Sequence, residues 1–390
     1  MTLVRPFPAK VVRQEWAEHV VSPLLESLSP EERARRLAAN PHSYLHVTRS
    51  ERDFGGHVTA AEIRTADAQA LQRLIDAGAY EDSAPALFVY RLSGPTEHTG
   101  VVGEVDTAAF VSGQVRGHES VQADRVQALV DQFAVVPARS ELVALLHSAG
   151  PEVAAIVEAI CETPPLLRFR GHDGIEQTIW RVQGEESTAT LSAELGRGAH
   201  YIADGHHRVA ATVHEWELRG RPPSTGVLCV IYPLNGLDLM PFHRRVRGPM
   251  DQATLLASLG SEFTIKEVAH PTDSTGSFCL YLAGRWYDGS FTPPRPPGVA
   301  GLDAAILHDR VLAPLLDIHA AGDPRLEVAS GRSPLADLAA RCDEDGGALF
   351  VLRAPTIDEL MTVADRGEAM APKTTYFEPK PQAGIFLRFS

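Results

Sequence analysis

The sequence lacks several features that define common protein classes. Its four cysteines form no C-x-x-C pair, which argues against a zinc site or a dense disulfide framework. No apolar run approaches the roughly 18 residues that cross a bilayer, and the first residues contain no apolar core of a signal peptide. No internal repeat or low-complexity segment is visible. We therefore expect a soluble, reduced, cytoplasmic protein with no membrane partner.

Positive charge is also scarce. The 390 residues include 36 Lys and Arg against 50 Asp and Glu, so the formal net charge is −14. An acidic surface repels phosphate backbones, which argues against binding nucleic acid through a broad basic face. A local basic pocket for a small phosphate compound stays open. The hydrophobic fraction of 44% is enough for a buried core, and the length predicts two or three domains, or one core with large additions.

The spacing of apolar residues predicts an alternation of helices and strands. Ser29-Pro30-Glu31-Glu32 is typical of a helix N-terminus within a helix-forming stretch over 24–39. Apolar residues at i, i+3, i+4 and i+7 predict an amphipathic helix that begins near Glu119 and another over 153–160. Further helices are expected at 68–77, between 203 and 226, at 302–316 and at 357–364. Strands are expected at 86–90, 178–182, 201–203, 226–232, 349–352 and 384–389, and a Pro/Gly-rich linker at 292–298.

The most informative segment spans 201–211 and consists of an apolar strand, an Asp-Gly turn and a helix start. Gly205 permits a backbone geometry closed to other residues. The first turn of a helix leaves backbone N–H groups without intrahelical partners and carries partial positive charge. With His206, His207 and Arg208 at that end, the sequence predicts an anion site best suited to phosphate. Adjacent helical residues point about 100° apart, so we expect one histidine to face the pocket and the other to brace the loop.

Other interpretations of this segment are open. Asp204 could simply cap the helix, and the histidines could lie in a turn without a functional role. A zinc site is disfavoured because His206 and His207 are adjacent in the sequence, not at i, i+4, and no obvious third ligand follows.

Two further segments contain candidate site residues. His118-Glu119 stands at the head of the helix expected near 119–133, where a carboxylate is stabilised in its ionised form and suits a metal ligand or a general base. The alternative there is only a favourable charge at a helix start. In the segment 370–380, Lys373 could neutralise a phosphate and Thr374 or Thr375 could donate to one. The alternative is a rigid surface turn before the last strand.

Taken together, these motifs resemble the bacterial and archaeal domain-of-unknown-function family 1015. The stretches that carry the resemblance are 5–10, 40–47, 117–119 with Asp124-Arg125, 202–208, 241–244 and 372–377. The Asp-Gly-His-His-Arg core also resembles the nucleotide-binding turn of the ParB/sulfiredoxin superfamily, which includes free L-serine kinases that use ADP or ATP.

This resemblance implies an α+β fold with a ParB/sulfiredoxin-like nucleotide-binding core over 111–250. An N-terminal α+β region (1–110) and a C-terminal α/β region (251–390) would elaborate it, and the latter would contribute to the site. The residues implied to bind phosphate are Gly205, His206, His207 and Arg208, joined by Lys373 and Thr374. Asp204 would shape the turn or help to hold a metal, Glu119 would activate the substrate hydroxyl, and His207 could donate to a transferring oxygen.

The function that follows is phosphoryl transfer from ADP or ATP, with Mg²⁺, to the hydroxyl of a small free amino acid, serine first. One alternative is a ParB-like nucleotide switch that closes on DNA, which the acidic charge and the lack of a helix-turn-helix pattern disfavour. A phosphoserine phosphatase or phosphotransferase would use the same site in reverse. A catalytically inactive scaffold is less attractive because Glu119 and 204–208 are present.

Overall fold

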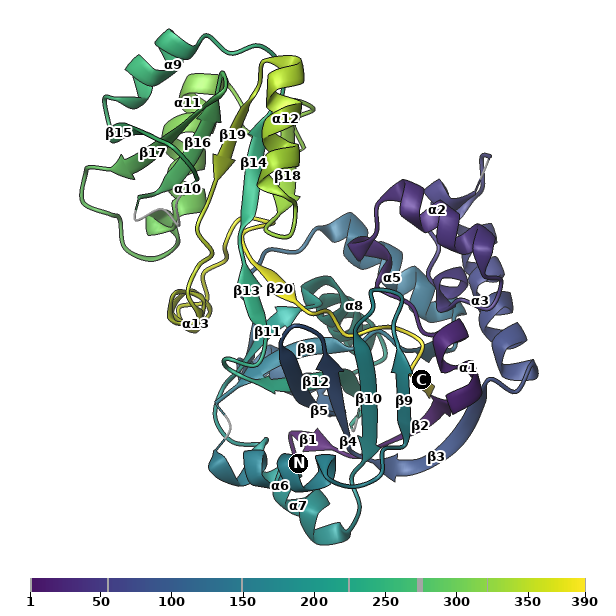
Figure 1. Cartoon of the computed structure of the whole chain (residues 1–390). Helices are drawn as coiled ribbons and strands as arrows, with labels where there is room; N and C mark the ends of the chain where they lie inside the picture. Colours follow the sequence, from purple (N-terminus) through teal and green to yellow (C-terminus); the bar gives the residue numbers. More distant parts are fainter. Residues whose placement is uncertain are drawn as a thin grey trace. The chain divides into compact units, whose positions relative to one another are not determined.

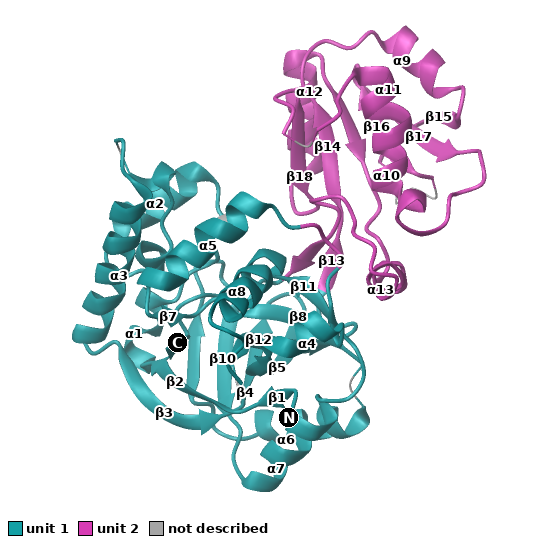
Figure 2. Cartoon of the chain, turned by 180° about the vertical axis from the view of Figure 1, so that it is seen from behind, with its two compact units in different colours: residues 1–117, 121–237, 379–390 teal, residues 118–120, 238–378 magenta. Residues whose placement is uncertain are grey.

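The computed structural model describes residues 2–54, 56–148, 150–223, 225–271, 276–320 and 322–389 and is an α+β protein. The chain forms two compact units (Figure 2). Unit 1 comprises Met1–Gly117, Val121–Leu237 and Pro379–Ser390, and unit 2 comprises His118–Ser120 and Asp238–Glu378. The predicted parts 1–110, 111–250 and 251–390 divide the chain at other places, since 1–110 and most of 111–250 lie together in unit 1.

Unit 1 is built on a large, mostly antiparallel sheet with the order β6-β11-β8-β12-β5-β4-β10-β9, in which β1 also pairs with β5. Its strands are β1 (Val4–Arg5), β4 (Phe88–Ser93), β5 (Glu97–Asp106), β6 (Val115–Arg116), β8 (Val143–His147), β9 (Leu167–Arg170), β10 (Glu176–Arg181), β11 (His200–Asp204) and β12 (Gly226–Pro233). Two of the pairings are parallel, β11 with β6 and β12 with β8. The apolar run of β12 is buried from Gly226 to Tyr232, as expected for a central strand covered on both faces.

A smaller sheet of unit 1 has the order β3-β2-β21-β7. It consists of β2 (Phe7–Val12), β3 (Tyr80–Ala86), β7 (Ala138–Arg139) and β21 (Phe386–Phe389). The helices of unit 1 are α1 (Gln14–Val20), α2 (Pro30–Ala39), α3 (Ala60–Asp76), α4 (Thr107–Ser112), α5 (Ala123–Val135), α6 (Pro151–Cys161), α7 (Glu185–Glu194) and α8 (His206–Leu218). Short 3₁₀ turns lie at Leu25–Ser27, Tyr44–Val47 and Glu51–Asp53.

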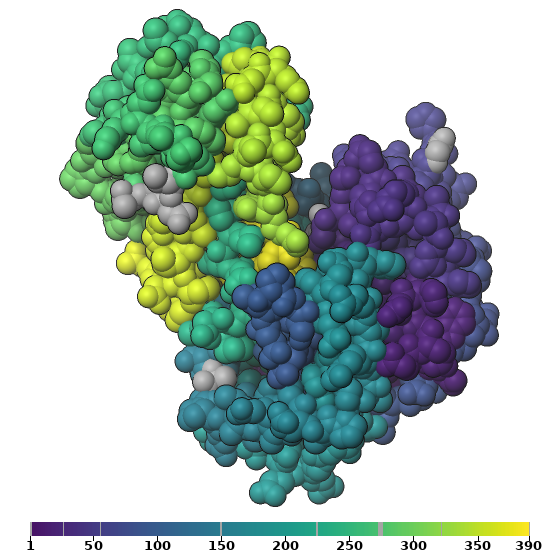
Figure 3. All heavy atoms as spheres, in the orientation of Figure 1, coloured from purple at the N-terminus to yellow at the C-terminus, as the bar shows by residue number. Residues whose placement is uncertain are grey.

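The main core of unit 1 lies between the large sheet and four helices. Ala109 of α4, Val153 of α6, Leu191 of α7 and Val209 of α8 pack with the apolar side chains of the sheet. Helix α8 also packs against α5 (Figure 2). In Figure 3, α6 and α7 (teal) form the surface at the lower end of unit 1.

Unit 2 contains an antiparallel sheet with the order β15-β17-β16-β19-β14-β18. Its strands are β14 (Phe242–Val246), β15 (Phe263–Val268), β16 (Phe278–Leu282), β17 (Arg285–Phe291), β18 (Leu326–Ser330) and β19 (Ala348–Val351), and β13 (Asp238–Met240) pairs separately with β20 (Tyr376–Glu378). The helices are α9 (Gln252–Leu259), α10 (Asp303–Leu307), α11 (Ala313–Leu316), α12 (Leu335–Asp345) and α13 (Ile357–Asp365), with a 3₁₀ turn at Gly298–Gly301.

The sheet of unit 2 is covered on both faces (Figure 1). On one face, Val246 and Phe350 join a core with Leu255 of α9 and Ile306 of α10. On the other face, Leu338 of α12 packs with partners from β16 and β19.

Several elements differ from the sequence-based predictions. The helix expected to begin near Glu119 begins at Ala123, with Gln122 as its N-cap. The predicted linker 292–298 lies inside unit 2, between β17 and the 3₁₀ turn at Gly298–Gly301. The helix predicted over 302–316 is interrupted by a π-helical turn at His308–Leu312, because Pro314 has no N–H to continue a regular ladder.

The helix predicted at 68–77 begins eight residues earlier, since α3 spans Ala60–Asp76, and the stretch predicted over 24–39 is α-helical only from Pro30. The other predicted elements are confirmed within a few residues, and the side chain of Ser29 caps α2 as expected, accepting from the Glu32 N–H at 3.2 Å. Cys229 and Cys279 are fully buried in the cores, and none of the four cysteines forms a disulfide. Among the helices that the structure describes, none combines the length and the apolar character needed to cross a bilayer.

Candidate functional site

The predicted strand–turn–helix segment is present as β11, Gly205 and α8. Gly205 has φ 105° and ψ 23°, a left-handed conformation that side chains other than glycine rarely adopt. A Cβ atom at this position would lie 3.1 Å from both Arg208 Cζ and Val143 Cγ2. As the N-cap residue of α8, Gly205 has no side chain that could cap the helix. The turn therefore requires glycine for two reasons, and glycine at the N-cap position brings no side-chain acceptor of its own to the start of α8.

Asp204 stands at the centre of an ion triad within unit 1. Its Oδ2 accepts from Arg208 Nη2, and its Oδ1 accepts from Lys380 Nζ. The guanidinium of Arg208 also donates to the Leu142 carbonyl oxygen through Nη1. Burial raises the pKa of the Asp204 carboxyl, but the Lys380 ammonium and the Arg208 guanidinium outweigh burial and hold this pKa well below its usual range. Two cations share one carboxylate, so the triad has a net charge of +1.

His206 is the more enclosed of the two histidines. Its ring packs against Gly117, where an added Cβ atom would lie 3.1 Å from His206 Cδ2. Burial lowers the pKa of His206 to about 4, although Asp204 opposes the shift. His206 is therefore a neutral imidazole at physiological pH and adds no positive charge to the helix start.

His207 has a different role. Its Nε2 accepts the Gln122 backbone N–H at 3.0 Å, at the N-cap of α5. Because Nε2 accepts, the proton of the neutral ring lies on Nδ1. His207 thus ties the first residues of two helices together, α8 and α5.

A pocket of unit 1 adjoins the same helix. Arg208 and Thr212, one turn apart on α8, line it together with Leu129 and Phe133 of α5. Arg139 also lines this pocket, and its guanidinium lies over the Phe133 ring at 4.1 Å and pairs with Glu215. Apolar side chains and a paired arginine thus line this pocket beside Arg208.

The segment His118–Ser120 belongs to unit 2, and Glu119 does not stand at the head of a helix. The Met370 N–H donates to the His118 carbonyl oxygen at 2.7 Å, and Glu119 forms an isolated parallel bridge with Met370. The ring of buried His118 lies 2.9 Å, Nε2 to Oγ1, from the hydroxyl of Thr375. The prediction that a helix start stabilises the Glu119 carboxylate is wrong, because these backbone contacts keep the residue extended.

Lys373 and Thr374 lie in the same loop of unit 2. Lys373 has φ 61°, and its exposed ammonium lies 5.3 Å from the centre of the Phe242 ring. Thr374 is buried, and its hydroxyl donates to the Ala371 carbonyl oxygen at 2.7 Å.

The third predicted segment, 370–380, contacts each of the other two predicted segments, one within unit 2 and one within unit 1. Residues 118–119 contact residues 370–375 in unit 2, and Lys380, which closes the third segment, reaches Asp204 in unit 1. Sequence reasoning placed Lys380 in a candidate segment without a role and missed Gln122 and Leu142. Of these three residues, only Lys380 could have been identified from the sequence, because it is a cation at the end of a candidate segment.

The predicted magnesium site does not fit Asp204 as this residue is placed, because both of its carboxylate oxygens accept from cations. Within the described ranges, no three His, Cys, Asp or Glu side chains gather in a way that holds a metal ion. Magnesium binding thus stays a prediction.

The fold and site define an α+β protein in which a left-handed glycine turn joins a strand to a helix. The chain belongs to the family described as "Protein of unknown function (DUF1015)", whose model matches residues 4–307, which confirms the resemblance seen in the motifs. No curated protein matches the chain.

Three solved structures are similar at low identity. A free serine kinase mutant in complex with ADP is 13% identical with a TM-score of 0.40, and the match covers 73% of this chain and 91% of that chain. A free serine kinase in complex with AMP is 14% identical with the same TM-score and coverage. A conserved hypothetical protein from Pyrococcus furiosus is 15% identical with a TM-score of 0.37, and the match covers 74% of this chain and 93% of that chain. Likenesses this distant do not establish an activity, and the ParB/sulfiredoxin core stays a prediction.

Proposed function

We propose that this protein binds a nucleoside di- or triphosphate at the start of α8 and transfers a phosphoryl group to the hydroxyl of a small free amino acid, serine first. The observation that carries the proposal is the Gly205 turn, which places the start of α8 beside a triad of net charge +1. Backbone N–H groups and the helix dipole favour an anion at this position.

The side chains of the motif contribute to this anion site in different ways. Arg208 and Lys380 supply positive charge, and Asp204 fixes both cations in place. Neutral His206 fills the space beside Gly117 and contributes no repulsive or attractive charge of its own. His207 can donate to a transferring oxygen only from Nδ1 while Nε2 accepts from Gln122.

Glu119 is our candidate for the group that accepts the hydroxyl proton, and the covalent chain supports this role. Glu119 follows Gly117, the residue that packs against His206, by two positions. It precedes Gln122, the residue that donates to His207, by three positions. Two contacts of the proposed anion site therefore flank Glu119 in sequence. Lys373 and Thr374 remain predicted phosphate contacts.

In the proposed reaction, the serine hydroxyl oxygen forms a bond to the terminal phosphorus while the bond from that phosphorus to the bridging oxygen of the nucleotide breaks. The hydroxyl proton passes to the Glu119 carboxylate, and the nucleotide departs with the bridging oxygen. A carboxylate is a weak base for an alcohol. In a loose transition state, however, the proton leaves late, so Glu119 chiefly orients the nucleophile.

The direct test mixes purified full-length protein with ADP or ATP, Mg²⁺ and each hydroxyl amino acid, and detects a phosphorylated product by mass spectrometry. We expect phosphoserine to form, and Glu119→Gln to abolish transfer while nucleotide affinity, measured by calorimetry, stays unchanged. Glu185→Gln, at the start of α7, is a matched control that should keep full activity. Protein that binds nucleotide but phosphorylates none of the amino acids would exclude the kinase function.

A further inference from the structure

Two arginines follow each other in β14 of unit 2, and their surroundings differ. Arg244 and Arg245 are 8% and 4% exposed. Arg245 pairs with Glu327 at 3.0 Å and with Asp345 at 2.6 Å. Within the described part of the chain, Arg244 pairs with no carboxylate and donates only to backbone carbonyl oxygens, of Phe242 at 3.1 Å and of Lys373 at 2.9 Å. One buried arginine thus has two counter-charges and its neighbour has none.

A buried guanidinium without a carboxylate is unfavourable, because carbonyl dipoles replace only part of the lost hydration. Burial lowers the pKa of Arg244 to about 10, so the group stays charged at neutral pH. A guanidinium has five N–H donors, and two of those of Arg244 are used by the carbonyl oxygens. The charge and the remaining donors suit an oxyanion, which a planar guanidinium binds well.

A second cation lies on the same face of the strand. Side chains alternate along a strand, so Phe242 and Arg244 point to one face and Arg245 to the other. The Lys373 ammonium lies over the Phe242 ring, and Lys373 also forms no ion pair with any described carboxylate. The Lys373 carbonyl oxygen accepts from Arg244, so this loop, with its left-handed Lys373 backbone, keeps both cations near Phe242.

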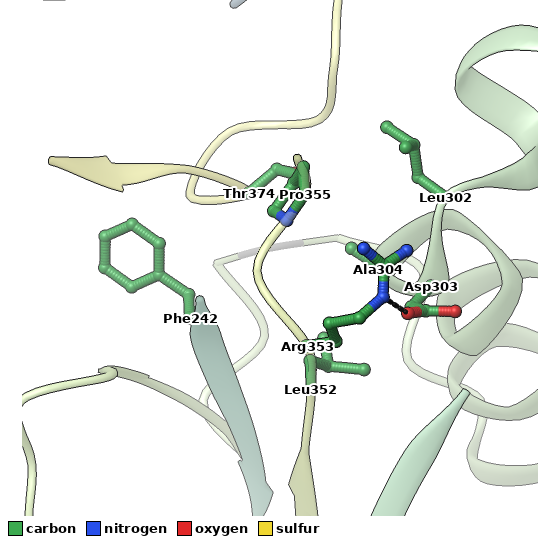
Figure 4. Close-up of a pocket in the computed structure, with 8 residues that line it drawn as sticks. All are labelled: Phe242, Leu302, Asp303, Ala304, Leu352, Arg353, Pro355 and Thr374. Carbon is green, nitrogen blue, oxygen red and sulfur yellow. Dashed lines mark hydrogen bonds and ion pairs between the residues drawn. The ribbon is translucent and has the colours of Figure 1, made fainter. Parts of the chain in front are cut away.

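A pocket opens at this place (Figure 4). Phe242 and Thr374 line one end of it, and Arg353 and Asp303 line the other. Asp303 is the one carboxylate that lines the pocket among the described residues, and it is neutralised by Arg353 at 3.2 Å and by Arg295 at 2.7 Å. The carboxylate of the pocket is therefore compensated by two arginines of its own. Arg244 and Lys373 adjoin the pocket without lining it: Arg244 donates to the carbonyl oxygen of Phe242, and Lys373 precedes Thr374 in the loop.

We propose that unit 2 contains a phosphate site of its own, in which Arg244 and Lys373 supply the charge. The identity of the phosphate compound rests on the proposed function: the group would come from the nucleotide or from the phosphorylated amino acid. The site itself is independent of it, since uncompensated charge on this face of β14 favours a phosphate whether or not transfer occurs. The competing role for Arg244 is only to staple the 371–374 loop to β14.

The test uses the full chain and measures binding of inorganic phosphate, ADP and phosphoserine by calorimetry, with chloride at matched ionic strength in the blank. We expect Arg244→Met and Lys373→Met to weaken binding of inorganic phosphate by about tenfold or more each. Arg285→Met is the matched control: Arg285 is an exposed arginine of the same unit, paired with Glu267 on β15. It should keep wild-type affinity. The ADP and phosphoserine arms identify the source, because the true ligand loses the most affinity in both variants.

Because Arg244→Met can disturb folding, Lys373→Met, at an exposed position, keeps the proposal testable. Wild-type affinity for all three probes in Lys373→Met, or no phosphate binding by the wild-type chain, would overturn the phosphate site. This outcome is separate from the kinase test. If the variants bind phosphate more weakly but the wild-type chain phosphorylates no amino acid, the phosphate site is supported and the kinase function is excluded. If the wild-type chain phosphorylates an amino acid but the variants keep wild-type affinities for phosphate and nucleotide, the kinase function is supported and the phosphate site is excluded.

Discussion

The Lys380 ammonium donates a hydrogen bond to the Asp204 carboxylate across 176 residues of sequence. Arg208 donates to the other oxygen of the same carboxylate from the first turn of α8. This arrangement connects the glycine turn to the last segment of the chain, and it makes Asp204 the counter-charge for two partly buried cations. The stability of the turn should therefore depend unequally on the three members.

Removing Asp204 should cost more stability than removing Lys380. Asp204→Asn leaves two enclosed cations facing an amide, and we expect a loss of about 3–5 kcal/mol. Lys380→Met leaves a neutral Asp204–Arg208 pair, with an expected loss of about 1–2 kcal/mol. Urea denaturation at pH 7, followed by circular dichroism, measures both. Equal losses for the two variants would contradict the unequal dependence described above.

Gly205→Ala should destabilise the protein through both backbone strain and crowding. A residue with a Cβ atom at φ 105° costs about 1–3 kcal/mol, and the new atom would also displace Arg208 or Val143. Gly113→Ala is the matched control, since Gly113 has φ 79° and no atom within 4 Å of an added Cβ. We expect Gly205→Ala to lower the free energy of unfolding by at least about 1 kcal/mol more than Gly113→Ala. A smaller effect at Gly205 would show that the turn relaxes freely.

Stability should fall as the pH drops from about 6.5 to about 4. The folded-state pKa of His206 is about 4, whereas an unfolded histidine titrates near 6.5. In this window the unfolded chain binds more protons, so protonation favours unfolding, and the loss from His206 is on the order of 3 kcal/mol. His243, with a pKa lowered to about 4 by burial, and His200, lowered to about 3, add losses of the same sign.

The contribution of His206 can be separated from those of the other two histidines. His206→Gln cannot be protonated, so its stability should fall less steeply than that of the wild-type chain between pH 6.5 and 4. Losses from His200 and His243 are common to both proteins and cancel in the difference. Parallel curves from chemical denaturation at several pH values would show that His206 is not kept neutral by burial.

His207→Ala should loosen the start of α5 without unfolding the protein. The substitution removes the acceptor of the Gln122 N–H, a bond that stabilises by about 1 kcal/mol, so the Gln122 amide should exchange with solvent about five- to tenfold faster. Hydrogen exchange measured by NMR reports this amide directly. His214→Ala, on an exposed part of the same helix, should leave the rate unchanged. Equal exchange in both variants would show that His207 does not brace α5.

The sequence was sufficient to predict the local structure of the site. The change from the apolar run at 201–203 to the spaced pattern of Val209, Val213 and Trp216 predicted the strand and the helix, and Gly205 marked the turn between them. These signals are local, because strand, turn and helix each depend on neighbouring residues.

The surroundings of the site could not be predicted in the same way. Apolar periodicity identified the interior of α5 but not its first residue, because the pairing of Glu119 with Met370 depends on residues 251 positions apart. The different surroundings of Arg244 and Arg245 could not be predicted either, because the sequence does not show which carboxylates lie near each of two adjacent arginines. Contacts across long sequence separations decide both.

The position of β21 has a consequence for the order in which the chain can fold during synthesis. This strand lies between β2 and β7 in the smaller sheet, yet the ribosome makes it after all of unit 2. Strands β2 and β7 must therefore wait, with unpaired edges, while the rest of unit 1 up to Leu237 and then Asp238–Glu378 of unit 2 emerge. Chaperone dependence should be concentrated in this interval, between the appearance of Arg139 and that of Phe386.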